Sequence, residues 1–265
     1  MKITIAFAIK LLLVLGCSTT PEDNNVPEPP TPSATKASAP GEPGLHEKLL
    51  VLDSHLDTPI HFHRPSYDFS RRGDYAEDGT QIDLPRLKEG GLDGGFWVIY
   101  TSQGSLDEAS YVAARTSALL RQMAIREMAA KYSDSVELAF SADDAARIHE
   151  SGKISVLQSI ENAYPLGEDL SLLETFYVGG VRMLGPVHFS NNQFADSSTD
   201  ETEAFGGLSS LGEALVREAN RLGMMIDASH ASDDALRDMM AVSTTPVILS
   251  HSGPDGVYEH GRNVP

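Results

Sequence analysis

The sequence lacks the residues that several classes of protein need. Cys17 is the only cysteine among 265 residues, so no disulfide can form within the chain, and a disulfide-stabilised miniprotein is excluded. Lysine and arginine total 20 against 38 aspartates and glutamates, which gives a net charge of -18 and leaves little basic surface for phosphates. The chain has no G-x-S-x-G elbow, and no glycine-rich phosphate-binding motif follows the first apolar run. These absences argue against nucleic acid as a partner, a nucleotide-binding fold and a serine hydrolase.

The N-terminal pattern predicts a secretion signal followed by a flexible linker. Residues 1–16 place Lys2 ahead of an apolar stretch that is too short to span a bilayer, a pattern typical of a secretion signal. The run VLGC resembles a bacterial lipobox, so Cys17 is the expected lipidation site. We therefore expect an anchor in a membrane of the cell envelope, with the protein on the periplasmic or extracellular side. Residues 17–44 are rich in proline and poor in apolar residues, which predicts a flexible linker before a folded domain at 45–265.

Short apolar runs and helical patterns alternate after the linker. Six runs are bounded by turn residues and predict buried strands: 49–57, 94–102, 154–161, 181–188, 224–230 and 245–251. Helices are predicted at 105–132 with a Ser105/Glu108 capping box, at 209–223 with Gly223 as its C-terminal cap, and from Ser232 as an N-cap. This alternation predicts an α/β fold with a parallel sheet, either doubly wound or closed into a barrel.

Polar residues at the ends of these runs favour the barrel. Four of the six runs end in residues that bind metals: His55 and Asp57, Glu161, His230 and His251. The carboxyl ends of barrel strands converge on one mouth, so residues far apart in the sequence meet there. His55 and Asp57 are two residues apart, a spacing that places both side chains on one side of a strand. The alternative is that these five residues are buried separately and hydrogen-bonded.

Imidazoles and carboxylates without thiolates suit zinc, although manganese, cobalt and iron also accept this set of ligands. One tetrahedral catalytic ion needs fewer ligands than these five residues supply. A site for two ions bridged by one carboxylate fits the set better.

Four segments together resemble the membrane (renal) dipeptidase family of zinc metallopeptidases, within the amidohydrolase superfamily of barrels. The segments are LDSHLDTP, SIENAYPLG, MMIDASH and PVILSHSGPDGVYEHGRNVP. The similarity covers residues 49–265 and implies a (β/α)8 TIM-barrel fold. By this resemblance His55 and Asp57 hold one zinc ion, His230 and His251 hold a second, and Glu161 bridges the two.

The resemblance also assigns roles to residues that the strand pattern does not single out. His188 would stabilise the oxyanion of the tetrahedral intermediate, and Arg262 would pair with a substrate carboxylate or with the oxyanion. The expected activity is zinc-dependent hydrolysis of dipeptides, including those with a C-terminal D-residue, by a hydroxide that bridges the two ions.

The sequence contains about six of the eight strands of the family barrel, and the family's further aspartate for proton transfer would lie beyond Pro265. We therefore expect a truncated barrel with unpaired edges at its first and sixth strands, which favours aggregation or a domain-swapped homodimer. Two other functions stay open at this point. One is a hydrolase with two metal ions that cleaves a lactone, a cyclic amide or a phosphoester. The other is a lipoprotein that binds metal or a small ligand without catalysis.

Overall fold

The computed structural model of the protein describes residues 44–265. The predicted signal at 1–16, Cys17 and the linker up to residue 43 lie outside the described residues. No helix within residues 44–265 has both the length and the apolar character needed to cross a bilayer.

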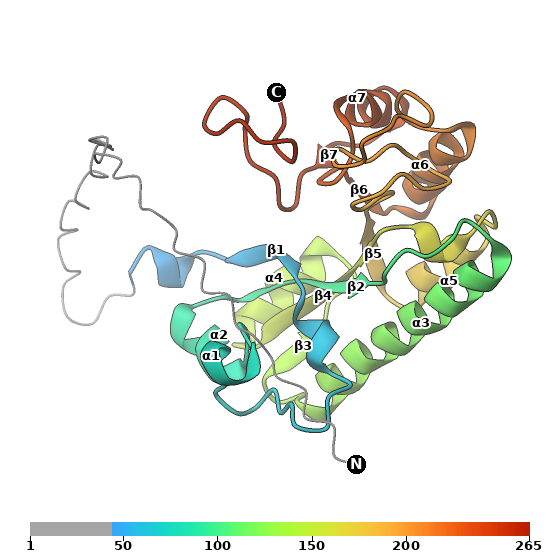
Figure 1. The fold of residues 1–265 in the computed structure, drawn as a ribbon. Coiled ribbons are helices and arrows are strands. Elements are labelled where there is room, and N and C mark those ends of the chain that lie inside the picture. Colours follow the sequence, from blue (N-terminus) through green and yellow to red (C-terminus); the bar gives the residue numbers. More distant parts are fainter. Residues whose placement is uncertain (1–43) are drawn as a thin grey trace, which may run out of the picture. The chain divides into compact units, whose positions relative to one another are not determined.

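A parallel sheet organises the described residues (Figure 1). Its strands follow the order β1-β2-β4-β5-β6-β7, and β3 pairs with β4 beside this path. The bounds of the strands are β1 Leu52–Leu56, β2 Gly94–Tyr100, β3 Val136–Leu138, β4 Ile154–Glu161, β5 Val181–Leu184, β6 Met225–Asp227 and β7 Val247–Ile248. The six predicted runs are the six strands of the path, which confirms an α/β fold built as part of a TIM barrel.

Helices connect the strands in the manner of a βα barrel. The α-helices are α1 Tyr75–Asp78, α2 Leu84–Gly90, α3 Glu108–Lys131, α4 Ala142–Glu150, α5 Leu172–Val178, α6 Ser210–Leu222 and α7 Asp233–Val242. Three short 3-10 helices are η1 His46–Lys48, η2 Thr58–His61 and η3 Tyr164–Leu166. The predicted caps of α6 and α7 are confirmed, because Gly223 is left-handed and the Ser232 side chain accepts the N–H of Ala235.

Several predicted boundaries are wrong. The N-cap of α3 is Asp107, whose carboxylate accepts the Ser110 N–H, whereas the carbonyl of Ser105 accepts the hydroxyl of Tyr164. The strands that were expected to reach His188, His230 and His251 end three or four residues earlier, so these histidines lie in turns and loops. The sequence pattern missed β3, in which Glu137 interrupts the apolar run.

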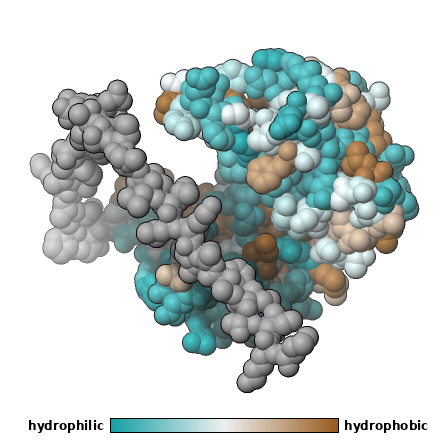
Figure 2. All heavy atoms as spheres, viewed as in Figure 1, coloured by the Kyte–Doolittle hydropathy of each residue, from teal (hydrophilic) through white to brown (hydrophobic). Residues whose placement is uncertain are grey.

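Among residues 44–265 the two larger clusters of buried hydrophobic residues lie on opposite faces of the sheet, and a third, small cluster joins Tyr111, Ala114 and Tyr164. Trp97 and Ile99 of β2 belong to the large cluster together with Ile125 of α3, while Phe96 packs with Leu157 and other residues of a smaller cluster. This division follows from the two-residue period of a strand. Figure 2 shows that the outer surface on this face is mostly hydrophilic, with hydrophobic residues in small separate groups, as the net charge implies.

The register of the sheet determines which residues at the carboxyl ends of the strands lie side by side. Tyr100 and Glu161 are partners at the carboxyl ends of β2 and β4, and Ile160 accepts the N–H of Gly185 just after β5. At the ends of the path, the Ser54 hydroxyl of β1 donates to the carbonyl of Ser250, just after β7, at 2.6 Å. The two outer strands of the path are therefore in contact with each other, through β1 and the residue that follows β7.

Candidate metal centre

Glu161 is the centre of a cluster of imidazoles. It ends β4, all eight residues of which are buried, and its side chain is 8% exposed. Four histidine Nε2 atoms lie near its carboxylate: His230 at 2.9 Å, His251 at 3.4 Å, His55 at 3.6 Å and His188 at 3.7 Å. The convergence that was predicted for His55, Glu161, His230 and His251 is therefore present in the structure, and His188 joins them.

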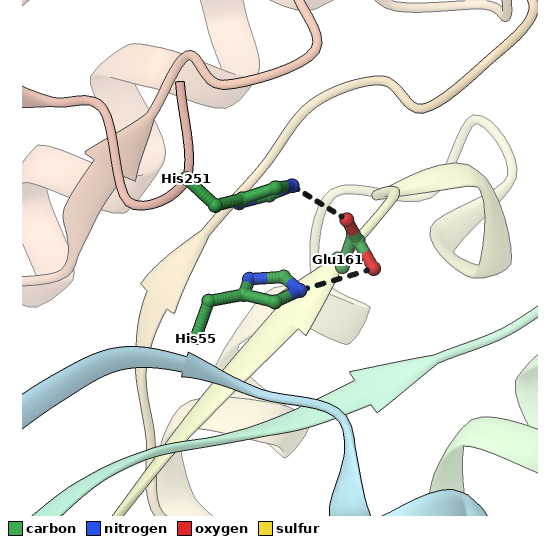
Figure 3. Close-up of side chains that lie close together, drawn as sticks. All are labelled: His55, Glu161 and His251. Carbon is green, nitrogen blue, oxygen red and sulfur yellow. Dashed lines mark ion pairs between the residues drawn. The ribbon is translucent and has the colours of Figure 1, made fainter. Parts of the chain in front are cut away.

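His55 and His251 approach Glu161 from one side (Figure 3). Their rings lie close together, with centroids 3.8 Å apart, although His55 belongs to β1 and His251 follows β7. Their Nε2 atoms face different oxygens of the Glu161 carboxylate, Oε2 and Oε1 respectively. One carboxylate thus lies near two imidazoles, one on β1 and the other just after β7.

His188 and His230 form a second group with Glu161. Their ring centroids are 4.1 Å apart, and the ring of Phe189 covers both at 4.0 and 5.3 Å. The backbone carbonyl of His230 accepts the N–H of Ser198, so the loop after β5 and the turn after β6 are joined next to the site.

The donor set fits a metal ion. Two groups of three residues, His55/Glu161/His251 and Glu161/His188/His230, bring their potential ligand atoms within 4.8 Å of one another. The Nε2 atoms of His230 and His251 lie 2.9 Å apart and share the neighbourhood of one carboxylate oxygen. The buried Nδ1 atoms of His55 and His230 have no hydrogen-bond partner among the described residues. Such a dense set of nitrogen and carboxylate donors is typical of a site for zinc or a similar divalent ion.

The local charges keep the carboxylate ionised. Burial alone would raise the pKa of Glu161, but hydrogen bonds from His230 and His251 and the charges of His55 and His188 lower it well below its usual range. Burial also works against a charged His55, yet Asp57 and Glu161 outweigh it and raise the pKa of that imidazole. Burial, together with the neighbouring His230, lowers the pKa of His188 to about 4. The cluster therefore holds a carboxylate among imidazoles of unequal basicity.

Asp57 lies beside the cluster. Its Oδ1 is 3.6 Å from Nε2 of His55, but its side chain is 67% exposed, and Asp57 is not in either group of three. The predicted strand geometry is wrong here, because β1 ends at Leu56 and Asp57 has a helical backbone at the start of η2. A turn after the strand brings Asp57 to His55. A cavity of about 190 Å³ opens beside both residues.

Arg262 reaches the same region from the C-terminal segment. Burial lowers the pKa of its guanidinium, while the carboxylates of Glu161 and Asp227 act in the opposite direction. Its Nη1 is buried without a hydrogen-bond partner among residues 44–265. A buried donor without a partner is costly, which makes Arg262 available to an anion at this site.

Sequence reasoning missed the residues that support these side chains. Asp227, at the end of β6, accepts the hydroxyls of Ser229 and Ser250, and the Ser250 hydroxyl lies 2.7 Å from Nδ1 of His251. This series of hydrogen bonds, from Asp227 through Ser250 to His251, holds the His251 ring so that Nε2 faces Glu161. Ser229 and Ser250 directly precede His230 and His251 in the sequence, but the sequence offered no sign of Asp227 beyond its place at the end of a strand.

A second support lies directly after Glu161. Asn162 is the only non-glycine residue with positive φ among the described residues, at 67°. Its side-chain oxygen accepts N–H groups from Tyr164 and Asn192, and its Nδ2 donates to Gln103. Three loops are thereby tied together behind the cluster. Strain of this kind persists where the surrounding structure fixes the chain, often at a functional site.

Comparisons with known proteins agree with this geometry. Residues 42–265 match the family described as membrane dipeptidase, peptidase family M19. Dipeptidase tcpJ of Claviceps purpurea is 36% identical over 220 residues, which cover 80% of this chain and 52% of that protein. Human dipeptidase 3 is 39% identical over 189 residues, which cover 70% of this chain and 37% of that protein. The chain thus spans about half or less of the length of these curated relatives.

Two solved structures share the fold. The probable dipeptidase PvdM of Pseudomonas aeruginosa superimposes with a TM-score of 0.76 at 33% identity, covering 82% of this chain and 56% of that one. A metallopeptidase of Rhodobacter sphaeroides, crystallised with a phosphinate mimic of the dipeptide L-Ala-D-Ala, gives a TM-score of 0.69 at 28% identity. That match covers 80% of this chain and 68% of the other.

Proposed function

The chain belongs to the membrane dipeptidase family, and we propose that it is a zinc-dependent dipeptidase that hydrolyses the peptide bond of dipeptides. The observation that carries this proposal is the cluster of four imidazoles around the buried carboxylate of Glu161. A hydrolase without an activated serine or cysteine needs another means of activating water, and this donor set supplies the ligands for one.

We propose that two ions share this cluster. His55 and Asp57 would hold one ion, His230 and His251 the other, and Glu161 both. The contacts of the Glu161 carboxylate support two positions, because Oε2 faces His55 while Oε1 faces His230, His251 and His188. Bound divalent ions would supply Lewis-acid chemistry, which makes water more acidic and polarises a peptide carbonyl.

His188 and Arg262 would act on the substrate itself. His188 lies within reach of the cluster and would donate a hydrogen bond to the carbonyl oxygen as negative charge develops there, an effect worth about 3 kcal/mol in other enzymes. Arg262 would pair with the carboxylate at a free C-terminus, because a guanidinium matches a carboxylate in two parallel hydrogen bonds. Such a pairing favours short substrates.

A C-terminal D-residue is part of the proposal. The Rhodobacter sphaeroides relative was crystallised with a mimic of L-Ala-D-Ala. We propose that this chain also accepts dipeptides of that configuration.

The test is hydrolysis by the purified protein after loading with zinc. L-Ala-D-Ala and L-Ala-L-Ala would be compared with a lactone, a cyclic amide and a phosphoester, each with and without chelator. We expect release of alanine that chelation abolishes and added zinc restores. Hydrolysis that survives chelation would contradict the proposal, as would cleavage of the other substrates alone. Bound zinc without hydrolysis of any substrate would instead support a binding lipoprotein.

We also propose that Cys17 is lipidated and anchors the protein at a membrane of the cell envelope, on its periplasmic or extracellular side. The lipobox-like VLGC sequence is the support for this proposal. Incorporation of radiolabelled palmitate into the wild-type protein, but not into Cys17→Ala, would agree with it. Equal labelling of the two proteins, or labelling of neither, would contradict it.

A further inference from the structure

A cavity beside the candidate metal centre is lined by a positively charged side chain, although the protein as a whole is negatively charged. It has a volume of about 470 Å³ and lies between the carboxyl end of β2, the first half of α3 and η2. Among residues 44–265, Arg121 is the only charged residue that lines it, in a chain of net charge -18. By contrast, a cavity of about 630 Å³ elsewhere on the protein is lined by six acidic residues and by no lysine or arginine.

Two polar groups in this cavity have no partner. The Thr101 hydroxyl is buried and makes no hydrogen bond among the described residues, and Thr101 as a whole is 5% exposed. The Nε of Arg121 is also buried and unbonded. Leaving a buried donor unsatisfied costs about 1 to 3 kcal/mol, so such groups usually meet a ligand or an ordered water.

One face of α3 lines this cavity. Ala113, Ala114, Ser117 and Arg121 lie on that face, because positions three or four residues apart on a helix are one turn apart. The two alanines give an apolar wall near the helix start, and Arg121 lies about two turns further on. The cavity therefore offers an apolar surface for methylene groups and a cation beyond them.

Tyr100 joins the cavity to the metal centre. It lines the cavity, it is the register partner of Glu161, and its ring lies 5.0 Å from the ring of His188. The ring of Tyr100 would thus separate a substrate held at Glu161 from the mouth of the cavity. Asp57, beside the cluster, is the carboxylate whose charge acts on Arg121.

We propose that this cavity binds a carboxylate carried by the side chain of the substrate, with Arg121 and Thr101 as its hydrogen-bond donors. The proposal rests on the proposed dipeptidase function and adds a substrate class to it, dipeptides that contain an acidic residue. A guanidinium binds a carboxylate through charge-assisted hydrogen bonds, and a hydroxyl supplies a third. Arg121 is distinct from Arg262, which is assigned to the carboxylate at the C-terminus.

Binding to the metal-free protein tests the cavity separately from catalysis. Calorimetry on chelator-treated protein would compare Ala-Glu with Ala-Gln and Glu-Ala with Gln-Ala, pairs that differ in charge and hardly in shape. We expect one glutamate peptide to bind at least about tenfold more tightly than its glutamine counterpart, as one charge-assisted contact implies. Arg121→Gln should remove this preference, Arg121→Lys should keep part of it, and Thr101→Val should reduce it by about threefold to tenfold.

Arg126→Gln is the matched control, because Arg126 lies on the same helix, is exposed and donates to the carbonyl of Gly179 outside the cavity. The control should keep the full preference. Equal binding of glutamate and glutamine peptides, no binding of either, or a preference that persists in Arg121→Gln would overturn the proposal. Hydrolysis of L-Ala-L-Ala by the zinc-loaded protein is measured in parallel. Its absence together with an intact preference would reject the dipeptidase function and leave the cavity assignment in place.

Discussion

Side chains reach the metal centre in two different ways. Glu161 and His55 are carried by strands of the sheet. Glu161 is the direct register partner of Tyr100, and His55 lies where the pairing of β1 with β2 shifts its register between Asp53 and Leu56. His188 and Arg262 are carried by irregular segments after β5 and β7. The strand residues occupy positions that any βα barrel provides, whereas the loop residues depend on particular polar contacts.

The loop after β5 shows what those contacts are. The Asp196 carboxylate is buried and accepts backbone N–H groups from four successive residues, 204–207, at distances between 2.7 and 3.1 Å. Its own carbonyl accepts the N–H of Ser232, and the hydroxyl of the adjacent Ser197 donates to the carbonyl of His188. The Asp196 side chain therefore stabilises the conformation of the loop that carries His188. At Glu161, strand pairing in the sheet fixes the backbone instead.

The largest effect is expected from Glu161→Gln, which removes the shared ligand and leaves the sheet in place. Loss of the charge should abolish tight metal binding and reduce hydrolysis by at least about a thousandfold, since the three proposed histidine ligands meet at this carboxylate. Metal content after dialysis and turnover of L-Ala-D-Ala provide the measurement, and an unchanged far-UV circular dichroism spectrum would confirm the fold. Glu174→Gln, an exposed position in α5, is the control. A Glu161→Gln variant that kept its metal would contradict the role of this strand residue as the shared ligand.

Asp196→Asn should have the opposite profile. The amide presents a donor where the carboxylate accepted several N–H groups, so we expect a loss of about 2 to 3 kcal/mol in the free energy of unfolding, measured in urea. Metal content should stay near that of the wild type, while turnover falls because His188 is less well placed. Glu203→Gln, exposed in the same loop, should change neither quantity. Loss of metal on the scale of Glu161→Gln would show that strand and loop residues are not separable.

The strand positions were the part that the sequence revealed. Apolar runs between turn residues gave the six strands of the path, and Glu161 stood at the end of one of them. The roles of His188 and Arg262 were predicted only from the resemblance to a family, because the sequence of a loop has no periodic pattern from which its path can be predicted. Asp196 and Arg121 had no signal at all, since an acid in a loop and a cation on a helix are usually solvated. Their roles depend on burial and on partners, which only the folded chain defines.

Ser250→Ala sharpens the comparison at the end of β7. Its hydroxyl connects Asp227 to the ring of His251, and outer contacts of this kind typically change metal affinity by 10- to 100-fold. We expect a loss at the lower end, about tenfold, because the backbone still holds His251 in place. Competition with a chromophoric chelator measures the change. Ser252→Ala, whose hydroxyl donates to the carbonyl of Ser229, is the control, and an equal loss in both variants would contradict the role of Ser250.

The smallest effect concerns the response of the loop to acid. Burial alone would raise the pKa of Asp196, but the backbone N–H donors outweigh it and lower the pKa below its usual 3.8. The stability that this carboxylate contributes is therefore fully present above pH 3.8 and is lost as the pH falls through the lower value of the folded protein. The difference in unfolding free energy between wild type and Asp196→Asn should therefore narrow between pH 6 and pH 3. A difference that stays constant or widens would contradict the account.

The most direct measurement is anomalous X-ray scattering at the zinc edge from crystals grown with zinc. The account predicts two peaks on either side of the Glu161 carboxylate, one within ligand distance of His55 and the other within ligand distance of His230 and His251. Peaks remote from Glu161, or no peak among these residues at a saturating zinc concentration, would contradict it.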